Sequence, residues 1–339
     1  MNAEMEQVLP AEKTPTKSMR QKLARIVPWA GWISLIVLLA IPVLGGSRYL
    51  VYIGTLIALQ AALAVSLNIV MGYAGQFAMS HAAFYGFGAY VSVILVASYG
   101  VNFWVAIPLA MLIAALLAAM VGYPALRNTG GVHLALITFA FGELLRLVAS
   151  NWHAVTGGPM GMRVMVSPPP LFGLDLSSAK GLYWLAVGML LLCLLITHII
   201  QRSRFGRGLV AIREDETLAS FLGVNVVGYK VAAYVISSML AAMVGCAYAP
   251  FMNFISPELL SAHETISLIG VLILGGIGTV AGPIIGTIIF FGIPEMLRVA
   301  RLYRLVLLGV IIVLVVLFMP KGVAGVFNDR IARWKRGIS

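Results

Sequence analysis

Charged side chains are scarce in this chain of 339 residues. Asp, Glu, Lys and Arg together make up 10% of it, whereas 61% is hydrophobic, and the mean hydropathy is +0.99. A soluble domain carries roughly 25% charged residues, so the composition argues against one. Several apolar runs approach or exceed the roughly 18–20 residues that a spanning helix needs, and residues 303–319 form the clearest of them. The sequence predicts an all-α, polytopic membrane protein.

Cysteine and reactive clusters are also scarce. Cys193 and Cys246 each lie in an apolar run, which argues against a disulfide framework or a cysteine metal site. No His, Cys and carboxylate group has metal-ligand spacing, and no nucleophile stands beside a base. The motif G-x-x-x-x-G-K-[ST] is absent, so the chain has no P-loop for ATP. We therefore expect no catalysis, no metal and no bound cofactor.

One glycine-rich stretch, GGIGTVAG at 275–282, superficially resembles a dinucleotide-binding loop. Its spacing is G-x-G-x-x-x-G, no strand is predicted before it, and it lies in an apolar run of membrane length. Small residues at four-residue intervals instead let helix backbones approach closely in lipid. We expect helix packing, rather than phosphate binding, at Gly278, Gly282 and Gly286.

The net charge of +11 comes from 23 basic and 12 acidic residues. The basic residues gather in the two tails and around 202–213, which is the pattern of cytoplasmic loops rather than of a nucleic-acid-binding stripe. We expect an N-terminal cytoplasmic tail at 1–28, a retained first span, a transmembrane domain at 29–319 and a basic cytoplasmic C-terminal tail at 320–339. About ten spans are predicted, near 29–45, 49–71, 75–98, 103–123, 131–150, 181–200, 230–250, 264–281, 283–297 and 303–319.

Residues 203–230 form the one long charged interruption in the middle of the chain. Apolar residues recur among the charges at helical spacing, which predicts a short amphipathic helix on the membrane surface. Such a helix offers a docking surface for a partner. An ordinary solvated loop that carries positive-inside charge remains the alternative.

Few polar residues interrupt the predicted spans. Glu143 and Arg146 are three residues apart on one helix and are expected to form an ion pair. Gln76, Ser80 and His81 lie near the start of the 75–98 span, where a broken helix that lines a cavity is one interpretation and structural packing is the other.

Five segments carry a resemblance to a known family. LNIVMGYAGQFAMSHAAFYGFGAYVSVIL (67–95) resembles the signature segment of bacterial branched-chain amino acid ABC transporter permeases, and 133–162 resembles the segment typical of their LivM-type subunits. Residues 203–230, LILGGIGTVAGPIIGT (272–287) and FMPKGVAG (318–325) match the same family in the same order. The resemblance runs from about Leu50 to Gly325.

The resemblance implies an ABC importer permease bundle of the bacterial inner membrane. Its expected partners are a LivH-like second permease, two cytoplasmic ATPases that bind ATP and Mg, and a periplasmic substrate-binding protein. It makes 202–229 the cytoplasmic coupling segment, with a loose E-x-x-A-x-x-x-G version of the importer motif. The candidate coupling residues are Arg213, Glu214, Asp215, Glu216, Ala219 and Gly223.

The same resemblance implies that the chain forms half of a translocation pathway for branched-chain amino acids. Candidate pathway residues in the 75–98 segment are Gln76, Phe77, Ser80, His81 and Phe84. Relatives that carry urea or short amides share much of the pattern, so these substrates stay open. An ion-coupled secondary transporter is a further alternative, for which Glu143 is the one serious coupling carboxylate.

Overall fold

The computed structural model describes residues 47–128, 131–170, 175–292 and, toward the C-terminus, 309, 317, 319 and 322–325. Within these ranges the chain is almost entirely helical, and six helices are long and apolar enough to cross a membrane. The six spans are Arg48–Tyr73, His81–Tyr99, Phe103–Arg127, His133–Asn151, Ala179–Arg202 and Val226–Met252. This confirms an all-α, multi-pass arrangement.

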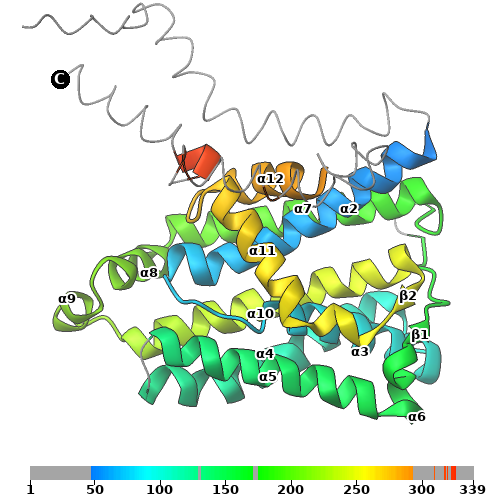
Figure 1. Ribbon diagram of the computed structural model, residues 1–339, viewed down its shortest axis with the longest axis horizontal. Helices are drawn as coiled ribbons and strands as arrows, with labels where there is room; N and C mark the ends of the chain where they lie inside the picture. Colours follow the sequence, from blue (N-terminus) through cyan, green and yellow to red (C-terminus); the bar gives the residue numbers. More distant parts are fainter. Residues whose placement is uncertain are drawn as a thin grey trace, which may run out of the picture.

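The spanning helices run roughly side by side along one direction (Figure 1). They are α2 (Arg48–Asn68), which continues as the π-helix η1 (Ile69–Tyr73), α3 (His81–Tyr99), α4 (Phe103–Asn128), α5 (Gly131–Asn151), α7 (Ala179–Arg202) and α10 (Val226–Met252). Helix α10 packs against α2, α3, α4 and α7 and is therefore the centre of the bundle.

Close backbone contact between α3 and α10 depends on two glycines. A Cβ added to Gly88 would lie 2.1 Å from the Ala242 carbonyl oxygen, and one added to Gly245 would lie 1.9 Å from the Tyr85 carbonyl oxygen. Such distances leave no room for a side chain. Lipid tails are as apolar as the helix side chains, so the hydrophobic effect does not drive helices together in the membrane. Close van der Waals contact of this kind is therefore a main source of helix association.

Four of the ten predicted spans are not seen as full-length helices in the part of the chain that the structure describes. The 29–45 span lies outside the described residues, as does most of 303–319. The 264–281 span is shorter than expected, because α11 (Ala262–Gly275) ends at Gly276. The 283–297 span begins as α12 (Gly282–Thr287), followed by the π-helix η4 (Ile288–Gly292). A glycine-rich turn at 276–281 thus separates two helical stretches, and the parts of them that the structure describes, Ala262–Gly275 and Gly282–Gly292, are each shorter than a full span.

The turn between α11 and α12 brings these helices together. A Cβ on Gly275 would lie 1.8 Å from the Gly282 carbonyl oxygen, and one on Gly286 would lie 2.0 Å from the Val271 carbonyl oxygen. Gly282 and Gly286 therefore lie at a close helix–helix contact. Gly278 lies in the turn itself, with φ +77°, and not on a helix face.

Small elements cap the two ends of the bundle (Figure 1). At one end lie α6 (His153–Thr156), the 3₁₀ helix η2 (Gly158–Met160) and an antiparallel strand pair, β1 (Met162–Arg163) with β2 (Phe254–Ile255). The strand pair joins the segment after α5 to the segment after α10, and a 3₁₀ turn, η3 (Pro257–Leu260), leads on to α11. At the opposite end α8 (Arg204–Glu214) and α9 (Glu216–Phe221) project beyond the long helices.

Candidate functional site

The charged segment after α7 forms two helices rather than one. Ser203 begins α8 by accepting a hydrogen bond from the Gly206 N–H at 3.0 Å. At Asp215 the backbone is extended, with φ −155° and ψ 109°, and its carboxylate accepts a hydrogen bond from the Leu218 N–H at 2.9 Å. An aspartate N-cap of this kind starts a new helix. The single amphipathic helix predicted over 203–230 was therefore wrong in its continuity, and α10 already begins at Val226.

The predicted coupling residues lie together at one end of the bundle, but they differ in exposure and in the residues they contact. Glu214 is exposed and lies 3.7 Å from Arg213. Glu216 pairs with the buried Lys230 at 2.5 Å, which ties the start of α9 to α10. Within α9, Ala219 is buried. Gly223, just after α9, has φ +81°, and a Cβ added there would meet open space.

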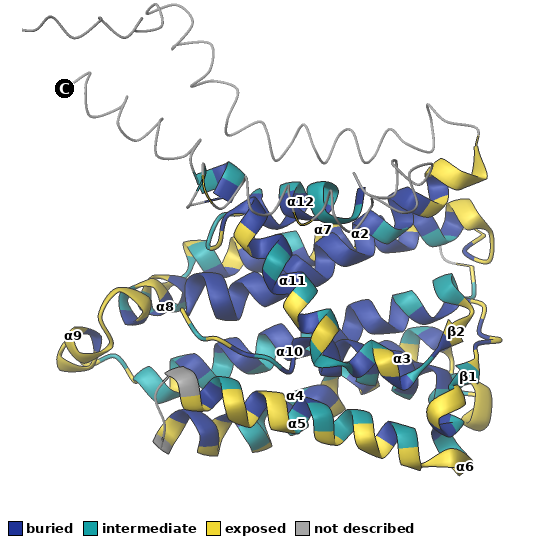
Figure 2. Cartoon of the chain, viewed as in Figure 1, coloured by how far each residue is buried: buried dark blue, intermediate teal, exposed yellow. Residues whose placement is uncertain are grey.

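The tip of this unit exposes apolar side chains. Leu218 is 56% exposed, Phe221 83% and Leu222 74%, and in Figure 2 the α9 ribbon is largely coloured as exposed. Glu214, Asp215 and Glu216 lie immediately before these residues in the chain. A small apolar patch beside acidic groups, on a unit that projects from the bundle, is typical of a protein-docking surface.

The candidate pathway residues divide into two groups. Helix α3 begins at His81 and not at residue 75, and residues 74–80 form an irregular segment that returns from the end of α2 beside α8 toward the middle of the bundle (Figure 1). Within this segment Gln76 is half-buried and Phe77 is 44% exposed. Ser80, His81 and Phe84, in contrast, are buried.

The start of α3 lies deep in the bundle, and side chains from other helices satisfy its polar groups. The Met79 N–H donates to Thr138 Oγ1 at 3.0 Å, and the Ala82 N–H donates to Thr265 Oγ1 at 3.1 Å. Ser80 Oγ lies 2.6 Å from the Tyr234 hydroxyl. A helix terminus inside an apolar bundle requires such partners, because free N–H groups there are costly.

His81 belongs to the same buried polar cluster. Its Nε2 lies 2.9 Å from Ser66 Oγ in α2, and Ser237 in α10 donates to the Ser66 carbonyl oxygen at 2.7 Å. Through this contact the first residue of α3 lies beside Ser66, near the C-terminal end of α2. In this structure His81 therefore connects α2, α3 and α10. Its role in a pathway stays a prediction.

A second polar cluster lies on α5. Arg146 Nε pairs with Glu143 Oε2 at 2.6 Å, as the sequence predicts. The other carboxylate oxygen of Glu143 accepts a long hydrogen bond, 3.4 Å, from the Ala262 N–H at the start of α11. Arg146 Nη1 also lies 4.0 Å from Glu258 in η3. The pair thus joins α5 to the connection before α11.

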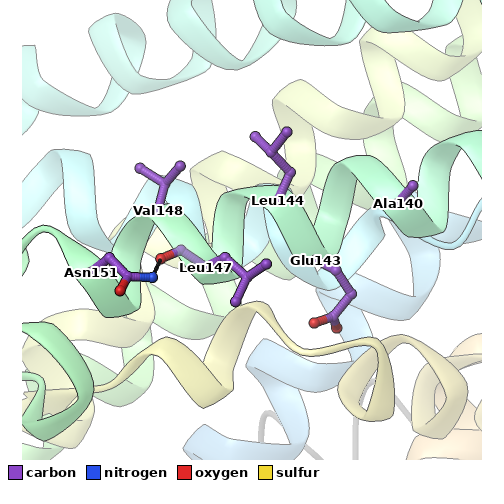
Figure 3. Close-up of a pocket in the computed structure, with 6 residues that line it drawn as sticks. All are labelled: Ala140, Glu143, Leu144, Leu147, Val148 and Asn151. Atoms are coloured by element: carbon purple, nitrogen blue, oxygen red, sulfur yellow. Dashed lines mark hydrogen bonds between the residues drawn. The ribbon is translucent and has the colours of Figure 1, made fainter.

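Beside this pair an open groove of about 360 Å³ runs along α5. Figure 3 shows that Leu144 and Val148 project from one side of the helix, whereas Glu143 points toward the other. The lining is almost wholly apolar and consists of Ala140, Glu143, Leu144, Leu147, Val148 and Asn151. A groove formed by one helix face is suited to packing against lipid or another helix, and it does not enclose a small ligand.

The sequence reasoning missed Asn68 and Tyr73, which form a third cluster at the end of α2. Asn68 Oδ1 accepts the Gly278 N–H at 2.8 Å, and its Nδ2 donates to the Thr279 carbonyl oxygen at 2.9 Å. The Tyr73 hydroxyl accepts a hydrogen bond from Gln201 at the end of α7. An asparagine inside an apolar run was an available signal, because polar residues within spans usually have a specific partner.

Groups of three or more His, Cys, Asp or Glu residues that could hold a metal ion do not occur in the part of the chain that the structure describes. Both cysteines are buried and free. The chemistry of these clusters is accordingly hydrogen bonding and ion pairing between helices.

Comparison with known proteins places these features in a family. Residues 49–316 match the family described as branched-chain amino acid transport system / permease component. The chain is 31% identical over 299 residues to the high-affinity branched-chain amino acid transport system permease protein LivM of Escherichia coli, which covers 81% of this chain and 70% of that protein. The corresponding protein of Salmonella typhimurium is 30% identical over the same shares.

More distant relatives belong to the same group of permeases. The LivH permease protein of Escherichia coli is 28% identical over 293 residues, which cover 80% of this chain and 92% of that protein. The autoinducer 2 import system permease protein LsrC of Yersinia pseudotuberculosis is 29% identical over half of this chain and 49% of that protein. No solved structure matches the chain. With its apolar helices of spanning length and a family match over most of its length, the chain belongs to the permease components of branched-chain amino acid transport systems.

Proposed function

We propose that this chain is the LivM-type half of the membrane pathway of an ATP-driven importer for branched-chain amino acids. Its partners are a LivH-like second permease, two cytoplasmic ATPases that carry ATP and Mg, and a periplasmic binding protein. The full chain has about ten spans, with both termini in the cytoplasm. Urea or short amides remain the alternative substrates.

The projecting α8–α9 unit is the single observation that carries this proposal. A chain without a P-loop depends on another protein for ATP hydrolysis, and this unit is the described surface best suited to meet one. Its apolar tip, Leu218, Phe221 and Leu222, supplies contact area, and exposed Glu214 supplies a charge that orients the partner. The end of the bundle that bears α8 and α9 is then the cytoplasmic end.

The arrangement of residues 74–80 supports a role in the pathway. Residues 74–80 carry Gln76 and Phe77 at the surface and lead to Ser80 and His81 in the interior. Irregular backbone at membrane depth is tolerated where protein buries it or where it lines a water-filled cavity. We infer that this segment borders the route between the two permeases, with Phe84 behind it.

Reconstitution tests the proposal. We expect proteoliposomes that contain both permeases, both ATPases and the binding protein to accumulate leucine when ATP is enclosed, and the lone chain to accumulate none. Uptake by the lone chain that is driven by a proton or sodium gradient would show a secondary transporter instead. Preferred uptake of urea by the full complex would leave the ATP-driven mechanism intact and change the substrate.

Two variants of the projecting unit test the docking surface in the same assay. Phe221→Ser and Glu214→Lys should each weaken co-purification of the ATPases, because they remove exposed contact area or reverse an exposed charge. Arg127→Gln is the control, since Arg127 is exposed at the end of α4 and stacks on Tyr123 of its own helix. Full ATPase binding by both docking variants would place the contact elsewhere.

A further inference from the structure

Arg213, in the last turn of α8, turns toward the membrane bundle. Its Nη1 donates a hydrogen bond of 2.5 Å to the carbonyl oxygen of Gly72 in η1, the π-helical end of α2. The two residues lie 141 positions apart in the sequence. Its Nη2 lies 3.7 Å from Glu214, the acidic group described beside it. A guanidinium that bonds a carbonyl of a spanning helix joins α8 to that helix.

Two glycines with positive φ make room for this side chain. Gly75 has φ +65°, and a Cβ added there would lie 2.7 Å from Arg213 Cγ. Gly278 has φ +77°, and its Cβ would lie 2.7 Å from Arg213 Nη1. Left-handed backbone is easily adopted only by glycine. Arg213 thus contacts both the irregular segment after α2 and the turn between α11 and α12.

The end of α2 is also held to the α11–α12 turn. Asn68 in α2 binds the N–H of Gly278 and the carbonyl oxygen of Thr279. A Cβ on Gly72 would lie 2.8 Å from the Gly278 nitrogen, so the end of α2 directly touches the turn. The π-helical winding at 69–73 departs from regular α-helical hydrogen bonding, and such segments occur frequently at functional sites.

We propose that Arg213 is a positioning residue that transmits movement of α8 to the end of α2 and to the α11–α12 turn. This inference rests on the proposed function, in which the ATPases move α8. The Arg213 side chain lies against three backbone segments at once: its guanidinium bonds Gly72 and lies beside Gly278, and its aliphatic stem lies beside Gly75. One of them, residues 74–80, leads directly to the buried start of α3. Displacement of α8 therefore shifts the segment that borders the proposed route.

The competing role for Arg213 is a direct contact with the ATPase. That role requires the guanidinium to face the partner, whereas here Nη1 is occupied by Gly72 and the side chain is 40% exposed. The two roles predict different losses. A transmitting residue affects the amount of amino acid moved per ATP, and a docking residue affects the association of the subunits.

The first test uses the complete complex with Arg213→Gln. We expect normal ATPase co-purification and normal basal ATP hydrolysis, with about tenfold less leucine imported per ATP hydrolysed, because a hydrogen bond from a charged donor is lost. Arg213→Lys keeps one charged donor and should recover part of the ratio. The wild-type complex shows separately whether ATP-driven uptake exists at all. Weakened association, as expected for Glu214→Lys, would overturn the proposal and make Arg213 a docking contact.

The second test leaves Arg213 in place and displaces it. Gly75→Ala puts a methyl group against Arg213 Cγ. Gly100 has the same φ of +65°, so Gly100→Ala introduces the same backbone strain, but nothing lies within 4 Å of its new methyl group. Gly75→Ala should lower the import-to-hydrolysis ratio while Gly100→Ala keeps it. Equal ratios in the two variants would contradict the proposal. This pair decides the question if Arg213→Gln cannot be recovered as a complex.

Discussion

Helices α2 and α5 have the same length, 21 residues, and both are apolar, yet they occupy opposite environments. Along the spanning window of α2, 83% of the residues are buried inside the protein, against 22% for α5. Figure 2 shows α2 mostly dark blue and α5 with a long exposed face. Small residues line α2, including Ala58, Ala61 and Ala62, which are fully buried, whereas α5 points Leu136 and Leu144 outward.

The comparison shows that hydropathy does not decide burial in a membrane protein. Lipid is as apolar as leucine, so neighbours are selected by how closely backbones approach. Glu143, which pairs with Arg146, points to the other side of α5 from exposed Leu144 and accepts a hydrogen bond from the start of α11. Charged groups in such a position are expected to face protein or water rather than lipid.

The largest expected effect is on the free energy of unfolding, which should fall when a leucine is truncated in α2 but hardly change when one is truncated in α5. Leu63 in α2 is 2% exposed and Leu144 in α5 is 54% exposed. Leu63→Ala should lower the free energy of unfolding by about 2–5 kcal/mol, because it leaves a cavity. Leu144→Ala should change it by about 0.5 kcal/mol, the scale of a lipid-facing leucine. Thermal unfolding of the lone chain in nanodiscs measures both, and equal losses would show that the exposed face of α5 is packed in the lone chain.

An intermediate effect is expected at the ion pair on α5. Glu143→Gln and Arg146→Met each leave one charge without its partner and should cost about 1–3 kcal/mol. The double variant removes both charges and should cost less than the sum. Additive losses in the same unfolding assay would mean that the two side chains do not stabilise each other. The pair formed by buried Lys230 and exposed Glu216, between α10 and α9, offers a comparison.

The smallest effect concerns residues 74–80, which lead from the surface to the buried start of α3. With Cys193→Ser and Cys246→Ser as background, Gln76→Cys should react with a small water-soluble thiol reagent in the lone chain, and Ser80→Cys should stay protected. Gln76 is half-buried and Ser80 is buried, which explains the difference. In the full complex with ATP trapped, Ser80→Cys should become reactive if residues 74–80 border the route. Protection of both positions in every state would remove this segment from the pathway.

Several features of the fold were predictable from the sequence because each depends on local chemistry. Apolar length predicted the six spans that the structure describes, and the i,i+3 spacing predicted the pair of Glu143 and Arg146. The start of α3 was not predictable in this way. Residues 75–80 are compatible with a helix in composition, but Thr138 and Thr265, from distant parts of the chain, cap a helix that begins at His81.

The sequence by itself determined the class of this protein, six of its membrane spans, the charged segment between them and its family resemblance, because composition, periodicity and motif order are local properties of the chain. Only the tertiary structure decided the direction of Arg213, the contacts of Asn68 with the turn at 278–279 and the break between α8 and α9. The first two depend on a carbonyl oxygen and an N–H that a distant segment supplies, whereas the break follows from the extended backbone at Asp215. A polar residue in an apolar run, such as Asn68, indicates that a partner exists, but the sequence does not show which distant segment supplies that partner.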